Sequence, residues 1–329
     1  MKEKVKKLTK PKVWSIISAS IVVVISIVLI ITNFFIPVKY LASYCVIGKR
    51  AKPGVMRVTF VDVGFGDSII VELPDGKNML IDAGDAGYTH KSKVFKELNK
   101  RDIDTIDYLI CSSVNKEHCG GLAEIVKHKN IGTVYMPYCK NKYITDEFCA
   151  FVNQIEKSRV EKIYSSYKKG VDTGEYFFTF LSPSAADLEY GEYQELNTNP
   201  SEATRANSSA MLWLEYADTA FLFTSDVQTS VLDFIVSMNE LSMGYLPVDI
   251  EKCKIVQLAG HGDKLSACAT FYDLLNPEVA IISVGKNGNG SPSNEAISDV
   301  VNSVGKNLYI TDKHGNITIE VTADGYTVR

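Results

Sequence analysis

The sequence has no closely spaced cysteine pairs, no internal repeats and no low-complexity runs. Its seven cysteines among 329 residues include no pair at the spacing of a zinc ribbon, and an odd count does not indicate a disulfide scaffold. We therefore expect most of them to be small, buried, apolar residues. Because 46% of the residues are hydrophobic and 22% are charged, the chain can bury a core, which excludes a disordered protein.

An excess of basic residues is also missing. Residues 1–12 hold six lysines and one acid, Glu3; without them, 29 of the 35 basic and 38 of the 39 acidic residues remain, a net charge near −9. Proteins bind nucleic-acid backbones through lysine and arginine, so we expect no strong nucleic-acid patch on the body of the chain. The sequence identifies no protein partner.

The N-terminus holds a long uncharged run. Residues 13–38 contain no charged side chain, and about 20 apolar residues cross a bilayer core as a helix. We predict a transmembrane anchor here, preceded by a basic cytoplasmic tail (1–12) and followed by a tether (39–55). Because the lysines precede the run, the positive-inside rule predicts a single-pass protein of the cell membrane with a cytoplasmic N-terminus and an extracytoplasmic body.

A cleaved signal peptide is the alternative reading of this run. The apolar core of a signal peptide is usually shorter, about 7–15 residues, and a site with small residues should follow it. Leu41-Ala42-Ser43-Tyr44 is a poor site of that kind. We therefore favour an uncleaved anchor.

The pattern of residues 56–329 predicts one α/β domain. Alternating strands come first, including a pair joined by the Pro74-Asp75-Gly76 turn, and helices then alternate with short buried strands. The polar stretch 183–208 predicts a long loop, and a hairpin is expected around Ala217-Asp218-Thr219. This order favours two sheets covered by helices. Polar residues lie at several predicted strand ends, where open α/β folds place their sites: Asp67, Asp82, Ser113, Asp226 and His261.

The segment LICSSVNKEHCGGL (109–122) carries the most chemical information. It places Glu117 and His118 just before Gly120-Gly121, at a predicted turn between a strand and a helix. A carboxylate oxygen and an imidazole nitrogen at such a turn suit zinc or manganese. A Glu-His pair alone is common on protein surfaces, so the neighbouring segments determine whether this pair indicates a metal site.

Several further segments are collinear with this one. Residues 58–85 hold Asp62-Val63-Gly64, Gly66-Asp67 and Leu80-Ile81-Asp82-Ala83-Gly84. They are followed by Asn207-Ser208-Ser209, Phe223-Thr224-Ser225-Asp226, His261-Gly262, residues 279–295 and residues 309–320. In order and spacing these motifs resemble the metallo-β-lactamase domain of ComEC-type competence proteins, over roughly residues 56–322. The resemblance implies a metallo-β-lactamase-like αββα four-layer sandwich.

The metal motif departs from the family's pattern, His-x-Asp-x-Asp-His-x-Gly-Gly. Ser113 and Asn115 stand at the first two ligand positions, where they correspond to one metal of a two-metal site. Glutamate replaces the next aspartate. The resemblance therefore implies one remaining site, with at most one zinc or manganese ion held by Glu117, His118, Asp226 and His261.

The remaining polar residues receive simpler predictions. The resemblance implies that His261 and Asp263 take part in proton transfer. Asp62, Asp67 and Asp82 are expected to fix turns, and for Asp67 a role behind the metal ligands stays open. Cys119 is expected to pack in the core, and His90, His128 and His314 are expected to be bystanders.

Two functions follow from this degenerate motif. The first is a membrane-anchored, metal-dependent hydrolase, a phosphodiesterase or nuclease by resemblance. The second is a catalytically inactive, membrane-tethered binding or scaffold protein on the same fold, with no ion bound.

Overall fold

The computed structural model describes residues 18, 20–28, 48–137, 145–183, 202–241 and 246–329. The predicted basic tail, and most of the predicted anchor and tether, lie outside the described residues. Residues 20–28 form a helix, and its apolar side chains such as Ile21 and Val22 are exposed. Among the described residues, no helix is both long enough and apolar enough to cross a membrane.

The first of two β-sheets has eight strands in the order β15-β14-β1-β2-β3-β4-β5-β6. Pairing is antiparallel from β15 to β3 and parallel from β3 to β6. The strands are β1 (Met56–Phe60), β2 (Ile69–Glu72), β3 (Asn78–Ile81), β4 (Thr105–Ile110), β5 (Asn130–Met136), β6 (Glu161–Tyr164), β14 (Ile317–Thr322) and β15 (Gly325–Val328).

The second sheet has seven strands in the order β13-β12-β11-β10-β9-β8-β7. Here β7 to β10 pair antiparallel, and β10 to β13 pair parallel. The strands are β7 (Gly170–Asp172), β8 (Tyr176–Phe180), β9 (Leu212–Tyr216), β10 (Thr219–Phe223), β11 (Cys253–Gln257), β12 (Val279–Ile282) and β13 (Leu308–Ile310).

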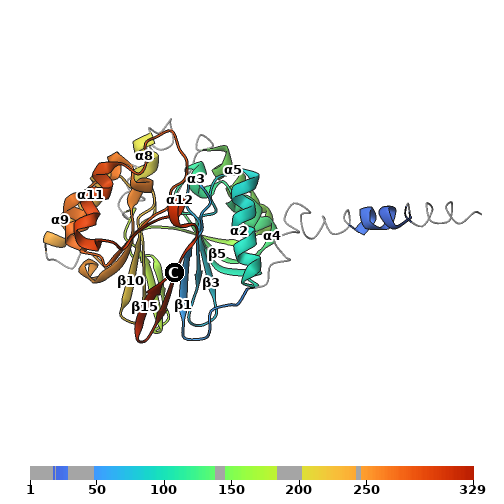
Figure 1. Ribbon diagram of the computed structural model, residues 1–329, viewed down its shortest axis with the longest axis horizontal. Helices are drawn as coiled ribbons and strands as arrows, with labels where there is room; N and C mark the ends of the chain where they lie inside the picture. The colour runs from blue at the N-terminus through green and yellow to red at the C-terminus, as the bar shows by residue number, and fades with distance from the viewer. Residues whose placement is uncertain (1–17, 19, 29–47, 138–144, 184–201, 242–245) are drawn as a thin grey trace, which may run out of the picture.

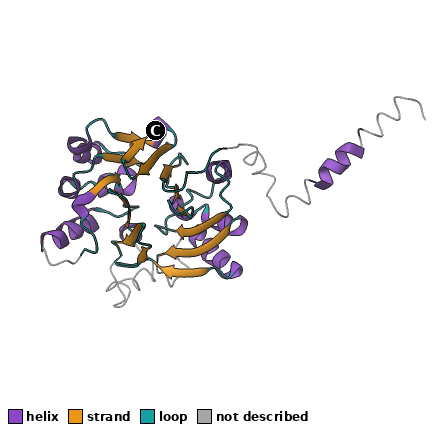
Figure 2. Cartoon of the chain, turned by 90° about the horizontal axis from the view of Figure 1, so that it is seen from below, coloured by secondary structure: helices purple, strands orange, loops and turns teal. Residues whose placement is uncertain are grey.

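Helices cover the outer face of each sheet, and the two inner faces pack against each other (Figures 1 and 2). Apolar side chains of α2, α4 and α5 cover the first sheet, those of α9, α10 and α11 cover the second, and a third buried cluster joins the sheets. The predicted αββα sandwich is therefore confirmed. The helices are α2 (Tyr88–Lys100), α3 (Lys116–Cys119), α4 (Leu122–His128), α5 (Asp146–Ser158), α8 (Glu202–Asn207), α9 (Thr229–Glu240), α10 (Ala269–Leu275), α11 (Asn294–Val304) and α12 (Thr311–His314).

The predicted hairpins are confirmed, and one predicted loop is partly wrong. β2 pairs with β3, and β9 pairs with β10, both antiparallel as expected. Within the predicted loop 183–208, residues 184–201 lie outside the described residues, but Glu202–Asn207 form the helix α8. The sequence EATRAN contains alanine, glutamate and arginine, which favour a helix locally even inside a polar stretch.

Two glycines allow the turn that carries His118 to lie against the end of the first sheet. A Cβ atom on Gly121 would come within 2.3 Å of the carbonyl oxygen of Ala83, and one on Gly120 within 2.3 Å of the backbone nitrogen of Ala86. Only glycine fits this close approach of two backbones. The close packing at these two glycines fixes the position of the turn, and the turn positions His118.

The substitution Gly121→Ala should lower the free energy of unfolding by about 1–3 kcal/mol, because the added methyl group overlaps backbone that cannot move aside. Chemical denaturation of the purified full chain measures the change. Gly288→Ala is the matched control, because nothing lies within 4 Å of its added Cβ. Equal losses in the two variants would contradict the packing argument.

Candidate metal centre

Two buried histidines from opposite sheets stack on each other where the strands end. His118 lies in α3, after β4 of the first sheet, and His261 lies in a 3-10 turn (Ala259–Gly262), after β11 of the second. Their ring centroids are 5.1 Å apart and their planes differ by 27°. The two sheets therefore jointly build the site, as the polar strand ends predicted.

Asp82 holds the His118 ring from behind. Its Oδ2 atom lies 2.9 Å from Nδ1 of His118, and both residues are buried. The backbone amide of Ser112 donates to Oδ1 of Asp82 at 2.7 Å, and the Ser112 hydroxyl donates to Oδ2. A proton on Nδ1 is thus held by Asp82, which leaves Nε2 free to bind a metal.

His261 is held in the same manner by the backbone of the second sheet. Its Nδ1 atom donates to the carbonyl oxygen of Ser283 at 2.8 Å. The residue has a positive φ of 57°, and the glycines on both sides, Gly260 and Gly262, also have positive φ. A non-glycine residue in this conformation carries strain that is typical of functional sites. Nε2 of His261 is therefore also directed away from its anchoring group.

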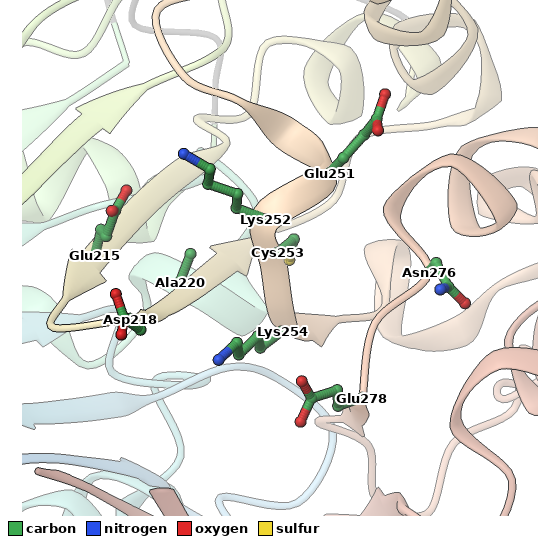
Figure 3. A pocket seen from close by; sticks show the side chains of 9 residues that line it. All are labelled: Glu215, Asp218, Ala220, Glu251, Lys252, Cys253, Lys254, Asn276 and Glu278. Carbon is green, nitrogen blue, oxygen red and sulfur yellow. The ribbon is translucent and has the colours of Figure 1, made fainter. Parts of the chain in front are cut away.

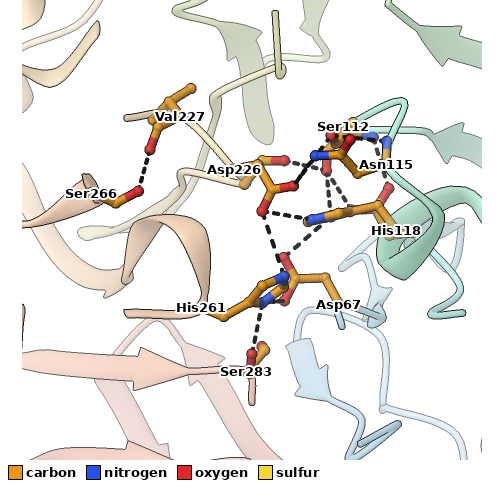
Figure 4. A network of polar contacts seen from close by, with 12 residues as sticks. Asp67, Ser112, Asn115, His118, Asp226, Val227, His261, Ser266 and Ser283 are labelled. Carbon is orange, nitrogen blue, oxygen red and sulfur yellow. Dashed lines mark hydrogen bonds and ion pairs between the residues drawn. The ribbon is translucent and has the colours of Figure 1, made fainter. Parts of the chain in front are cut away.

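Asp226 completes the cluster, and three ligand atoms converge on one space (Figure 4). Its Oδ1 atom lies 2.9 Å from Nε2 of His118 and 3.5 Å from Nε2 of His261. One ligand atom from each of the three residues lies within 4.8 Å of the others. Both Nε2 atoms are buried and share the single Oδ1 atom of Asp226 as their polar contact. A cation between the three residues would be held by all three atoms at once.

Asp67 lies on the opposite edge of the two stacked rings. Its Oδ2 atom is 3.5 Å from Nδ1 of His118, and its Oδ1 atom is 3.6 Å from Nδ1 of His261. Oδ1 is buried and has no hydrogen-bond partner. The imidazoles are thus enclosed between two aspartates, Asp226 at the Nε2 edges and Asp67 at the Nδ1 edges.

The carboxylates shift the acid–base properties of the cluster. Burial alone would lower the pKa of His118, but Asp226 and Asp82 outweigh it and raise that pKa well above its usual value. Burial alone would raise the pKa of Asp226, but His118, His261 and Asn115 lower it. Burial raises the pKa of Asp67, against the opposing effect of the two histidines. In the absence of a cation, the two carboxylates therefore favour the imidazolium form of His118.

The structure brings together three of the four predicted metal ligands. His118, Asp226 and His261 converge, whereas Glu117 does not join either group of candidate ligands among the described residues. Asp263, predicted to transfer protons, instead accepts a hydrogen bond from the backbone of Leu265 at 2.7 Å and caps the turn Lys264–Ser266. Its other oxygen, Oδ2, lies 3.4 Å from the Ser291 hydroxyl, which donates to it. Asp263 lies outside the candidate ligand groups of the described residues, and its role in proton transfer stays a prediction.

Asp67 and Asp82 contact the histidines directly, which the sequence did not predict. Both were expected mainly to fix turns, and the structure shows a second candidate ligand group of Asp67, Asp82 and His118. Their positions next to predicted strands β2 and β3 were the available signal. Their contact with histidines that lie far away in the chain could not be read from spacing.

A cleft of about 820 Å³ lies beside the cluster. Phe65, Asn115 and Glu117 line it, and the Phe65 ring lies 4.7 Å from the His261 ring. Its wall carries charges of both signs. His90, predicted to be a bystander, also lines this cleft. Glu117 therefore lines this cleft and does not join the ligand cluster.

A smaller hollow of about 350 Å³ lies at the other end of the second sheet (Figure 3). It is lined by residues of the β9–β10 turn and by residues next to the start of β11 and β12, among them Glu215, Asp218 and Glu278. Within the described part of the chain, no candidate ligand group includes these acids. We therefore place the functional site at the histidine cluster.

Comparison with known proteins gives one relative in sequence. No family model matches the chain. Over 278 residues the chain is 23% identical to ComE operon protein 3 of Bacillus subtilis (strain 168). The match covers 79% of this chain but 32% of that protein, so the activity of the whole relative does not transfer to this chain.

Solved structures with a similar fold share little sequence. CmlA, a diiron β-hydroxylase from Streptomyces venezuelae, is 13% identical with a TM-score of 0.47, over 82% of this chain and 55% of that one. A diphosphatase from the PhnP family is 11% identical with a TM-score of 0.42, over 82% of this chain and 99% of that one. At such identities a likeness carries no information about substrate.

The cluster predicts a pH dependence for the metal-free protein. The stabilising effect of His118 is complete below its unfolded pKa, about 6.5, and is lost as the pH rises through its raised folded pKa. The stabilising effect of Asp226 is complete above the pKa that its carboxyl has in the unfolded chain, about 3.9. It is lost as the pH falls through the lowered pKa that the carboxyl has in the folded protein. The pair should therefore stabilise the protein most between about pH 4 and pH 6.5.

Unfolding with a chelator present, followed from about pH 4 to about pH 9, measures this effect. His118→Gln cannot carry the charge, so it should lose about 3–5 kcal/mol, typical of a buried ion pair that loses one partner. The loss should shrink toward alkaline pH. Parallel curves for the two proteins would contradict the assignment of His118 as an imidazolium.

Proposed function

We propose that this chain, which carries a ComEC-like domain of the metallo-β-lactamase fold, is a membrane-anchored hydrolase that acts with a single metal ion. One observation carries the proposal. Nε2 of His118, Nε2 of His261 and Oδ1 of Asp226 converge in a buried space while each Nδ1 atom is already held. Two imidazoles and one carboxylate are a ligand set that suits zinc or manganese and leaves a position open.

The residues around the proposed ion have separate roles in orienting its ligands and in proton transfer. When bound, the ion would supply Lewis acidity and lower the pKa of a water molecule to about 7. Asp82 and the Ser283 carbonyl orient the two imidazoles, and Asp67 adds a second buried carboxylate beside them. Glu117 lines the adjacent cleft, and its carboxylate would accept a proton from a bound substrate or water there.

The proposed substrate is a phosphodiester. Its support is the similarity to the ComEC-type domain and the basic side chains of the cleft, among them Lys116, Arg205 and Lys286. Asp62, Asp85 and Asp312 line the same cleft. This mixed wall does not favour a long polyanion, so a short phosphodiester fits it better than double-stranded DNA.

A non-catalytic binding protein is the competing function. Its support is the state of the cluster without a cation, in which His118 lies between Asp82 and Asp226 and balances part of their charge. A fold that satisfies its own buried charges has no absolute need of a metal.

A phosphodiesterase assay with zinc or manganese separates the two functions. His118→Ala and Asp226→Ala should each lower the rate by at least about 100-fold, because loss of a partner behind a ligand already costs about 10–100-fold. Asp218→Asn, a carboxylate of the distant hollow, is the matched control and should keep the wild-type rate. Equal rates in all four proteins would leave only the binding function.

We propose that residues 13–38 anchor the chain with the body outside the cell membrane. The support is the uncharged run and the six lysines before it. Alkaline phosphatase fused after Arg329 should be active, and a fluorescent protein fused there should be dark. In the control, glutamine replaces the six lysines, which should reduce this orientation. The reverse reporter pattern would place the body in the cytoplasm.

A further inference from the structure

The two oxygens of the Asp226 carboxylate face different partners. Oδ1 faces the two imidazole Nε2 atoms, at 2.9 Å and 3.5 Å. Oδ2 accepts a hydrogen bond from the side-chain amide of Asn115 at 2.8 Å, and the Ser113 hydroxyl lies 3.5 Å from the same atom. Figure 4 shows Asn115 and His118 approaching Asp226 from the same turn.

The amide of Asn115 engages Oδ2 without offering a ligand. Its NH₂ group donates protons and has no lone pair for a cation. If the amide were turned over, its carbonyl oxygen would face Oδ2 at the same short distance, and two acceptors would meet with no proton between them. Because that arrangement needs a cation to be stable, the amide orientation and a second ion exclude each other.

The turn that carries His118 also holds Asn115 in place. The main-chain carbonyl oxygen of Asn115 accepts hydrogen bonds from the backbone amides of His118 and Cys119, both at 3.1 Å. The backbone amide of Asn115 lies 3.3 Å from the Ser113 hydroxyl and donates to it. The backbone turn that positions the His118 ring therefore also positions the side-chain amide of Asn115.

We propose that the Asn115 amide, with the Ser113 hydroxyl, occupies the side of Asp226 that a second cation would need, and so limits the cluster to one ion. Asn115 is a positioning residue, because it also keeps Oδ1 directed at the two histidines. The inference rests on the proposed function only in taking the cluster to be a metal site.

The test is the metal content of the full chain in detergent, after equilibration with zinc and removal of free metal. In Asn115→Asp, two carboxylates face each other at the distance of the present hydrogen bond, and they need a cation or a shared proton. We expect about one ion more per chain than in the wild type, and a larger rise of the melting temperature on adding zinc.

Asn239→Asp is the matched control. The amide of Asn239 also donates to a carboxylate, that of Glu251 at 3.4 Å, but on the exposed surface and outside any candidate ligand group. This variant should bind no more zinc than the wild type. An equal gain in both variants, or no gain in Asn115→Asp, would overturn the inference.

A second variant keeps the inference testable if Asn115→Asp does not fold. Ser113→His combined with Asn115→Asp supplies an imidazole as well as the carboxylate, and it too should gain about one ion. If neither variant folds even with zinc present, the inference fails, because it requires a cation to reconcile the two carboxylates. The wild-type content itself tests the proposed function: no ion there, with a gain in Asn115→Asp, would reject the single-ion hydrolase and keep the role of Asn115.

Discussion

The contact between Asp82 and His118 is the interaction on which the site depends. Asp82 ends a strand of the first sheet with a positive φ of 58°, and its carboxylate is fully buried. It holds Nδ1 of His118 and accepts two hydrogen bonds from Ser112, whose hydroxyl also lies 2.6 Å from that of Ser225, just after β10 of the second sheet. One carboxylate thus orients a ligand, fixes the turn after β4 and connects the two sheets at the base of the cluster.

Charge balance explains why the cluster suits a cation. Asp67, Asp82 and Asp226 are buried beside only two imidazoles, and desolvated carboxylates need compensation. A divalent ion bound to neutral histidines supplies it. Protonation of His118, together with the raised pKa of Asp67, supplies it in another way. Metal binding and protonation therefore compete for the same buried charges, and a bound ion must displace the His118 proton.

The architecture of the domain could be predicted from the sequence, and the candidate site could be predicted in part. The alternation of apolar residues and the turn residues predicted the strands that end near Asp82, Asp226 and His261, because these are local signals. Glu117 was predicted from its place in a motif, but a side chain beside His118 can face either the cluster or the cleft, and only packing decides between them. The resemblance implied a role in proton transfer for Asp263 as well as for its near neighbour His261. The left-handed backbone at residues 260–262 could not be predicted from spacing, and it directs the side chains of His261 and Asp263 to different partners.

The pairing of β1 with β14 has a consequence for biosynthesis. Arg57 of β1 contacts Glu320 of β14 across 263 positions of the chain, and β14 lies between β1 and the last strand. β1 therefore leaves the ribosome long before β14, and one of its edges stays uncovered until β14 has been made. Until then that edge is exposed to pairing with other chains. The first sheet can therefore close around β1 only after β14 has been synthesised, late in translation of the body.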